Sequence, residues 1–244
     1  MSDFVRVQED EGVLEVRFCR ADRKNALTLA MYEAAAAALR EAGESDSTRA
    51  VVISGEGGHF TSGNDLLDFM KSPPTDESSP VFQFLLALRR CPRPVLAAVE
   101  GYAIGIGTTM LLHCDMAWAD RGAQFRMPFV PLGLVPEAGS SQILPAIAGH
   151  RRAAELLYFG DFFDAEAARE VGIINDVVDT DVRAHALERA RALAALPPEA
   201  LAQTKTLLRG PGDDVEEAMR REAAIFIERL QSPEFLEAAA RFAK

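Results

Sequence analysis

The fold of this chain is decided by two glycine-containing loops, residues 59–66 (HFTSGNDL) and residues 100–107 (EGYAIGIG). Each loop follows a short apolar run, at residues 50–54 and 95–99, that predicts a buried strand. Glycine lets the backbone of a loop approach a ligand closely, because it has no side chain. The loops are therefore candidates for ligand binding, and the alternative is that they are tight turns between strand and helix.

The segments around these loops alternate between strand and helix patterns. Alternating apolar and polar residues at 4–7 and 13–18 predict a β-hairpin. Thr28 is a plausible N-cap for a helix at residues 29–42, and prolines 92 and 94 end a helix at residues 78–90. Further helices are predicted at residues 105–113, 139–149, 151–159, 164–171, 182–196, 198–208 and 214–230, and further strands at 116–119 and 173–178. The pattern indicates an α/β core closed by C-terminal helices.

Length and composition exclude several classes of protein. The 244 residues are 48% hydrophobic and 26% charged, as in a globular protein with a real core, and no apolar stretch approaches a membrane span. The net charge of −11 argues against binding to nucleic acid or to an acidic membrane. Three cysteines without a CxxC pair, and an N-terminus without a hydrophobic secretory segment, favour a reducing compartment and a cytoplasmic location.

Several other kinds of site are disfavoured by the motifs. Gly105-Ile106-Gly107 begins a dinucleotide-binding pattern, but Met110 stands where the third glycine belongs. No phosphate-binding GKS or GKT follows either loop, and no GxSxG serine motif occurs. The adjacent residues 113–115 (HCD) would point to alternating sides of an extended chain, so we expect no metal site there.

The chain resembles the crotonase superfamily, also called the enoyl-CoA hydratase/isomerase family, nearly from end to end. The resemblance is carried by the order and spacing of residues 23–27 (RKNAL), 60–66 (FTSGNDL), 94–107, 114–117 (CDMA) and 125–134. It implies an α/β fold of stacked ββα turns, with a spiral core at residues 1–190 and a C-terminal helical region at 191–244 that supports trimer formation. We therefore expect a homotrimer or a dimer of trimers.

The resemblance also implies the ligand, an acyl-CoA thioester, and an oxyanion hole made by two backbone N–H groups. By motif position these donors fall on Asn64 and Ile106; the family often has glycine at the second position, but a backbone donor needs no particular side chain. Removal of a proton next to a thioester carbonyl leaves negative charge on its oxygen, and one such donor is typically worth about 3 kcal/mol. No cofactor is expected, since coenzyme A is part of the substrate.

The acid–base residues indicate which reaction is carried out. Enoyl-CoA hydratases use two glutamates, and the matching positions here hold Thr109 and Phe129, neither of which is a competent base. The segment around Pro136-Glu137 resembles the peroxisomal-type Δ3,Δ2-enoyl-CoA isomerase branch, which implies Glu137 as the catalytic base. A position at a helix start would lower the pKa of Glu137 and an apolar pocket would raise it, and the sequence leaves both possibilities open.

The expected substrate contacts follow from the same motifs. They are Arg23, Lys24, Ala26, Ser62, Asn64, Asp65, Leu66, Tyr102, Ile106, Gly107 and Phe129. Arg23, Lys24 and also Lys205 could meet the phosphates of coenzyme A, or be solvated charges. Asp65 has a second interpretation, as a helix cap or a residue that shapes the hole. The acyl pocket is predicted at residues 66–69, with Phe82 and Phe129.

Three hypotheses for function remain at this stage. The first is an enoyl-CoA isomerase that shifts a double bond from Δ3 to Δ2 through a dienolate, with Glu137 as base. The second is another crotonase-type reaction, such as hydration of an enoyl-CoA. The third is an acyl-CoA-binding protein that has lost activity, because absent hydratase glutamates are also compatible with an inactive protein.

Overall fold

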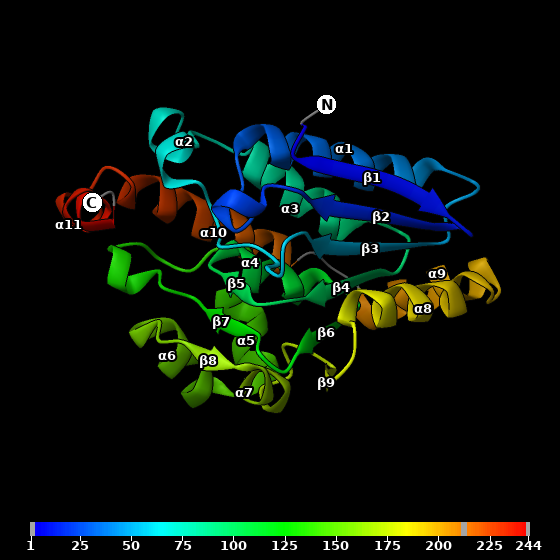
Figure 1. Cartoon of the computed structure of the whole chain (residues 1–244). Coiled ribbons are helices and arrows are strands. Elements are labelled where there is room, and N and C mark those ends of the chain that lie inside the picture. The colour runs from blue at the N-terminus through cyan, green and yellow to red at the C-terminus, as the bar shows by residue number, and fades with distance from the viewer. Residues whose placement is uncertain (1–2, 211–213, 243–244) are drawn as a thin grey trace.

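The computed structural model describes residues 3–210 and 214–242. Its main sheet has the strand order β1-β2-β3-β4-β6-β9 and is parallel except for the β1–β2 hairpin (Figure 1). The strands are β1 (Val5–Asp10), β2 (Val13–Phe18), β3 (Ala50–Gly55), β4 (Val95–Val99), β6 (Met116–Asp120) and β9 (Asp176–Val178). A second sheet has the order β5-β7-β8, with β5 (Tyr102–Ile104), β7 (Gln124–Arg126) and β8 (Phe163–Asp164). The predicted α/β class is confirmed.

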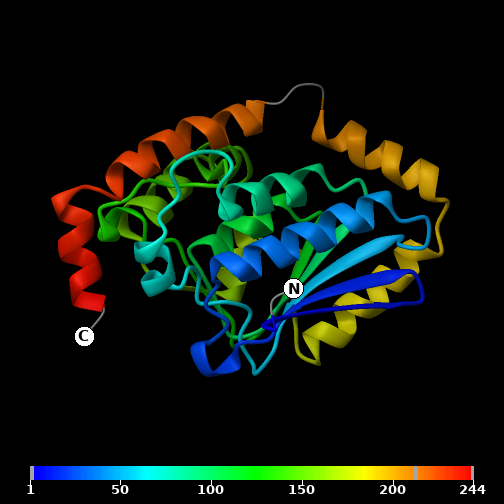
Figure 2. The same ribbon diagram turned by 90° about the horizontal axis from the view of Figure 1, so that it is seen from above.

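Helices cover the sheets and form the end of the chain. The first half contributes η1 (Ala21–Arg23), α1 (Leu29–Glu44), α2 (Leu66–Lys71), α3 (Pro80–Arg90), α4 (Ile106–Thr109), η2 (Met110–His113) and η3 (Val130–Leu132), where η marks a 3₁₀ helix. The second half contributes α5 (Ser140–Ala148), α6 (His150–Phe159), α7 (Ala165–Glu170), α8 (Val182–Ala194), α9 (Pro198–Arg209), α10 (Asp214–Arg229) and α11 (Pro233–Phe242). Seen from above, α11 lies on the opposite side of the molecule from α8 and α9 (Figure 2).

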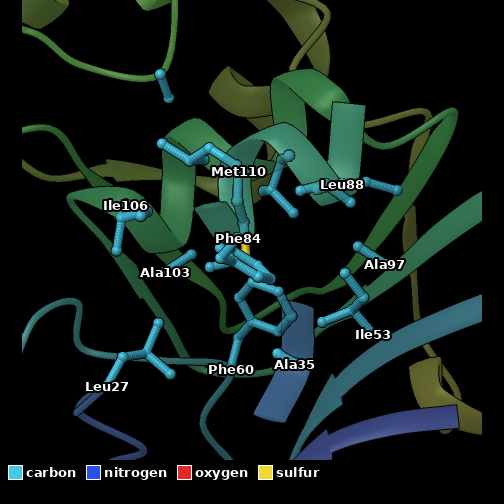
Figure 3. Close-up of a cluster of buried hydrophobic side chains, with 14 of the residues drawn as sticks. Leu27, Ala35, Ile53, Phe60, Phe84, Leu88, Ala97, Ala103, Ile106 and Met110 are labelled. Carbon is cyan, nitrogen blue, oxygen red and sulfur yellow. The ribbon is translucent and has the colours of Figure 1, made fainter. Parts of the chain in front are cut away.

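The central strands β3 and β4 are buried on both faces, which explains their nearly continuous apolar sequence, whereas the edge strand β1 is largely exposed. In β3 the side chains alternate: Val51 and Ile53 face a cluster formed with α1 and α3, whereas Ala50 and Val52 face α8. Figure 3 shows the first cluster, in which Phe60 lies beside Ala35 of α1 and Phe84 of α3. Burial on both faces fixes the strand register and therefore the places where the loops leave the sheet.

Some predicted elements are confirmed and others are wrong in detail. The N-terminal hairpin is present, and the Thr28 side chain caps α1 by accepting the Met31 N–H. The single helix predicted at residues 105–113 is wrong, because Gly105 has a non-helical conformation and the segment tightens into η2 after Thr109. The strand predicted at 173–178 is shorter, as β9, and the helix predicted at residue 139 begins at Ser140. The predictions also lacked α2, α11 and the second sheet, whose strands span only two or three residues.

Of the helices that the structure describes, none has an apolar stretch long enough to cross a membrane.

Candidate active site

The two glycine-containing loops lie side by side and are joined by backbone hydrogen bonds. Phe60 N–H donates to Glu100 O over 2.7 Å, Thr61 N–H donates to Tyr102 O over 2.8 Å, and Ile104 N–H donates back to Thr61 O over 3.1 Å. Gly63 packs directly on this second loop: a Cβ at Gly63, whose φ is +90°, would lie 2.7 Å from Ile104 O. The main chains of the two loops can approach this closely because residue 63 has no side chain.

The two predicted oxyanion donors sit where these loops meet a cavity. Within the described part of the chain, neither the Asn64 N–H nor the Ile106 N–H has a hydrogen-bond acceptor. The Ile106 side chain points into the apolar core (Figure 3) and is 2% exposed. Both residues line a cavity of about 270 Å³. Preorganised backbone donors of this kind stabilise developing negative charge.

Gly105 sets the conformation of the second donor. Its φ of 58° and ψ of −120° lie in a region that is essentially restricted to glycine. This conformation ends β5 and starts α4 at Ile106, so the Ile106 N–H belongs to the first residue of a helix and has no carbonyl one turn earlier to bond to. The glycine is therefore required by backbone geometry, although a Cβ at this position would meet nothing within 4 Å.

Glu137 lines the same cavity, three residues before the start of α5. Glu137 is half-buried, and its Oε1 accepts a hydrogen bond from the Thr109 hydroxyl. Burial raises the pKa of Glu137 to about 8; the Thr109 hydrogen bond opposes the rise and the charge of Glu222 adds to it. Of the two effects that the sequence suggested for this pKa, the rise on burial is therefore the one that the structure indicates.

The side chain of Asn64 is fixed from the opposite side by a tyrosine. Tyr32, from α1, is 1% exposed, and its hydroxyl donates to Asn64 Oδ1 over 2.6 Å. Burial, together with the charge of Glu137, raises the pKa of Tyr32 well above its usual value, so this hydroxyl is a donor. Tyr32 could not be identified from the sequence, because its position on an apolar helix face is typical of a core residue.

Two apolar cavities meet at Asn64 and Glu137. The larger, of about 270 Å³, is lined partly by Leu66, Phe129, Leu134, Phe226 and Phe235. The smaller, of about 50 Å³, extends between α3 and α10 and is lined partly by Phe82, Leu85, Met219 and Ile227. Phe69 of α2 and Phe226 of α10 line both, with their rings edge to face at 6.3 Å. Of the predicted acyl-pocket residues, Leu66, Phe69, Phe82 and Phe129 line these cavities. Leu67 and Asp68, which the predicted range 66–69 also included, do not line them, because the Leu67 side chain of α2 faces outward and is 60% exposed. The contribution of α10 was not predicted.

The remaining predicted contacts fall into separate groups. A third, more polar cavity of about 610 Å³ adjoins Asn64 and is lined partly by Arg23, Ala26, Ser62, Asp65 and Leu66. Asp65 also caps α2 and pairs with Arg20 at 2.6 Å, so its interpretation as a capping residue is confirmed.

Four of the proposed contacts are not among the residues that line these three cavities: Lys24, Tyr102, Gly107 and Lys205. Lys24 Nζ lies over the ring of the half-buried Tyr102, 4.7 Å from its centre. Gly107 packs on Thr61, since a Cβ at Gly107 would lie 2.7 Å from Thr61 Cγ2. Lys205 is 7% exposed and pairs with Asp115 at 2.7 Å, so this lysine joins α9 to the sheet.

The residues 113–115 separate, as expected for neighbours in a chain. His113 contacts Ala138 O, the Cys114 thiol donates to Met110 O, and Asp115 accepts from the Val95 N–H. Among the residues that the structure describes, no group of three or more His, Cys, Asp and Glu side chains could hold a metal ion.

Comparison with known proteins agrees with this geometry. The profile of the enoyl-CoA hydratase/isomerase family matches residues 8–243. The chain is similar to human enoyl-CoA delta isomerase 2, with 34% identity over 211 residues that cover 83% of this chain and 53% of the human protein. It spans about half the length of that relative. A protein of Rhodobacter capsulatus named "Probable enoyl-CoA hydratase" is also 34% identical, over 98% of this chain and 94% of its own length.

A solved structure supports the same assignment. The structure of OdaA from Pseudomonas aeruginosa superposes with a TM-score of 0.96 and 46% sequence identity, and covers 99% of both chains. The paired loops, the two unbonded N–H groups and the family match over almost the whole sequence therefore agree, and the chain belongs to the enoyl-CoA hydratase/isomerase family, the crotonase superfamily.

Proposed function

We propose that the protein is a Δ3,Δ2-enoyl-CoA isomerase in which Glu137 is the only acid–base residue. The observation that carries the proposal is the position of Glu137: its half-buried carboxyl lies where two apolar cavities meet beside Asn64, and the larger of the two is also lined by Ile106. The resemblance to human enoyl-CoA delta isomerase 2 supports it.

The proposed reaction moves one proton from C2 to C4 and shifts one double bond, with no net oxidation or reduction. Ionised Glu137 takes a proton from C2 of a 3-enoyl thioester, and the C3=C4 double bond becomes part of a dienolate. The negative charge on the thioester oxygen is stabilised by the Asn64 and Ile106 N–H groups. Protonated Glu137 then gives the proton to C4, which leaves a C2=C3 double bond. The sequence of steps needs no water and no redox cofactor.

The residues at the hydratase positions favour isomerisation over hydration. Thr109 stands at the first position and donates its hydroxyl to Glu137, so it is bonded to the base and is not a base itself. Phe129 stands at the second position and is 5% exposed in the cavity wall. Neither can activate water. An apolar pocket also suits the hydrocarbon part of an acyl chain.

The proposal extends to the parts of the ligand outside the cavity and to assembly. We propose that coenzyme A reaches the site past Arg23 and Lys24, which are exposed beside Ser62. We also propose that the protein forms a homotrimer or a dimer of trimers, supported by the C-terminal region at 191–244. The cytoplasmic location remains a prediction.

The test is to incubate the purified protein with a 3-enoyl-CoA and, separately, with a 2-enoyl-CoA, and to resolve the products by chromatography and mass. We expect the 3-enoyl ester to convert to the 2-enoyl ester without a change of mass. The Glu137→Gln variant should lose this activity by at least about 10³-fold while it binds the ester with unchanged affinity. Gain of one water by the 2-enoyl ester would instead establish a hydratase, and binding without any conversion would establish an acyl-CoA-binding protein.

A further inference from the structure

Glu137 stands on a turn whose backbone conformation is unfavourable for its sequence. The next two residues, Ala138 and Gly139, both have left-handed conformations, with φ of 60° and 69°. Glycine adopts this conformation readily, but alanine does so at a cost because of its Cβ. A strained turn persists only where the surrounding structure holds it, and such turns concentrate at functional sites.

A buried glutamate from the C-terminal helices holds this turn. Glu222, on α10, accepts the Gly139 N–H at 2.6 Å with Oε2 and the Ser141 N–H at 2.9 Å with Oε1. From the other side, the ring of His113 contacts Ala138 O through Nε2 at 2.6 Å. Glu222 and His113, which are distant from the turn in sequence, thus both bond to the backbone between Glu137 and α5.

Glu222 has no other evident reason to be buried. It is 6% exposed, and within the described ranges no arginine or lysine lies at salt-bridge distance from it. A buried carboxylate without a paired cation is costly, so its two N–H donors are its compensation. Burial raises the pKa of Glu222, and the hydrogen bonds from the Ser141 and Gly139 N–H groups oppose that rise by stabilising the ionised carboxylate.

We propose that Glu222 is a positioning residue for the base: it holds the Ala138–Gly139 turn so that the Glu137 carboxyl faces the cavity shared with Asn64 and Ile106. This inference rests on the proposed function, in which Glu137 takes the proton. It makes α10 a part of the active site in two ways, since Phe226 and Met219 of the same helix also line the cavities.

The arrangement has an electrostatic consequence. Two neighbouring carboxyls resist ionising together, so the charge held on Glu222 keeps Glu137 protonated to higher pH and makes its ionised form a stronger base. The other groups that face the pair are Tyr32 from α1, Thr109 from α4 and His113 from η2, with Arg221 acting on Glu222 from its own helix. None of these is a cation in contact with Glu137, so the charge of Glu222 is not cancelled there.

The test compares Glu222→Gln with Glu222→Asp, and uses Glu228→Gln as the matched control. Glu228 is an exposed glutamate on the same helix, so its variant changes the net charge of α10 equally without touching the turn. Two readouts are taken: the pH dependence of kcat and kcat/KM for a 3-enoyl-CoA, and an infrared titration of the protonated Glu137 carboxyl, identified by subtraction of the Glu137→Gln spectrum.

We expect Glu222→Gln to lower kcat about tenfold with KM changed less than threefold, and to shift the Glu137 titration to lower pH by about half a unit or more. Glu222→Asp keeps the charge but is too short to reach both N–H groups, so kcat should fall while the titration stays near that of the wild type. Glu228→Gln should match the wild type in both readouts.

Two results would overturn the inference. The first is a Glu222→Gln protein with unchanged kcat and an unchanged Glu137 titration; if that variant does not fold, wild-type kcat in Glu222→Asp is equally decisive. The second is an equal shift in Glu228→Gln. If the wild type does not isomerise 3-enoyl-CoA, the proposed function fails, but the infrared titration still tests whether Glu222 acts on Glu137.

Discussion

At the scale of single residues, the proposed proton transfer depends on how far the Glu137 carboxyl is removed from water. A glutamate with an ordinary pKa would be a weak base for a proton next to a thioester carbonyl, and a pKa near the working pH is better matched to proton transfer. Burial supplies the rise, to about 8, while Thr109 stabilises the ionised form by donating its hydroxyl. In the proposed reaction, Thr109 therefore moderates the pKa of the base and does not activate water.

This balance predicts a pH profile. Since only ionised Glu137 can take the proton, kcat/KM for a 3-enoyl-CoA should rise with pH through the pKa of about 8 and then level off. Thr109→Val removes the hydrogen bond that favours the ionised form, so the rising limb should move upward by about one pH unit. Initial rates between pH 6 and 10 check this. If kcat/KM of Thr109→Val rises over the same pH range as that of the wild type, the Thr109 hydroxyl does not act on Glu137.

At the scale of elements, the proposed oxyanion hole depends on two loops that pack together. Neither loop holds its N–H groups in place alone; the backbone bonds from Phe60, Thr61 and Ile104 set their separation. Gly63 allows this contact, because the Cβ of any other residue at this position would clash with Ile104 O. Asn25 also holds the start of the first loop, because its buried side-chain amide donates to Glu56 O and His59 O.

We therefore predict that Gly63→Ala separates the two donors and lowers kcat/KM by about 10²-fold, as when one oxyanion donor is lost. Gly58→Ala is the matched control. Gly58 also has a left-handed φ, of 75°, but a Cβ there meets nothing within 4 Å. It should lose about 1 kcal/mol of stability through backbone strain and keep kcat within about twofold. Equal loss of kcat in both variants would assign the effect to strain and not to the hole.

At the scale of the whole molecule, the site lies between the sheet region and the C-terminal helices. The loops come from the ends of β3, β4 and β5, whereas Phe226 and Glu222 come from α10, which packs beside α5 (Figure 2). Closing the cavity with these helices removes water from Glu137. Enclosure of a carboxyl is useful for the reaction and unfavourable for folding, so we expect activity and stability to oppose each other here.

The effect of Glu137 on folding stability depends on pH. The folded-state pKa of Glu137, about 8, lies above its unfolded value of 4.5, so between these values the folded state binds more protons. The stability that Glu137 contributes is therefore complete below pH 4.5 and is lost as the pH rises toward 8. Glu137→Gln should have similar stability at pH 5 and be more stable than the wild type by a few kcal/mol at pH 8.

Urea unfolding at a series of pH values, at one protein concentration, measures this difference. Exposed Glu228→Gln serves again as the control and should follow the wild-type curve at every pH. A difference between Glu137→Gln and wild type that stays constant from pH 5 to 8 would contradict the raised pKa.

The α/β fold class, the main buried strands and the two glycine-containing loops could be predicted from the sequence alone. These follow from local signals: continuous apolar runs predict buried strands, and glycines predict close backbone approach. Glu137 could be selected only through the resemblance of its flanking residues, because a glutamate near a helix start is more often a structural residue. The hairpin and the Thr28 cap were local features as well, and both are present.

Only the tertiary structure decided the contacts between segments far apart in the chain. The pKa of Glu137 depends on burial by several elements, and no local pattern reports that burial. Tyr32 and Glu222 are separated from the residues they hold by 32 and at least 81 positions, so no spacing could reveal them. Lys205, which could have met coenzyme A, is instead buried against Asp115. A charge on a helix has the same local sequence signal whether it faces solvent, substrate or another helix, and only packing distinguishes these outcomes.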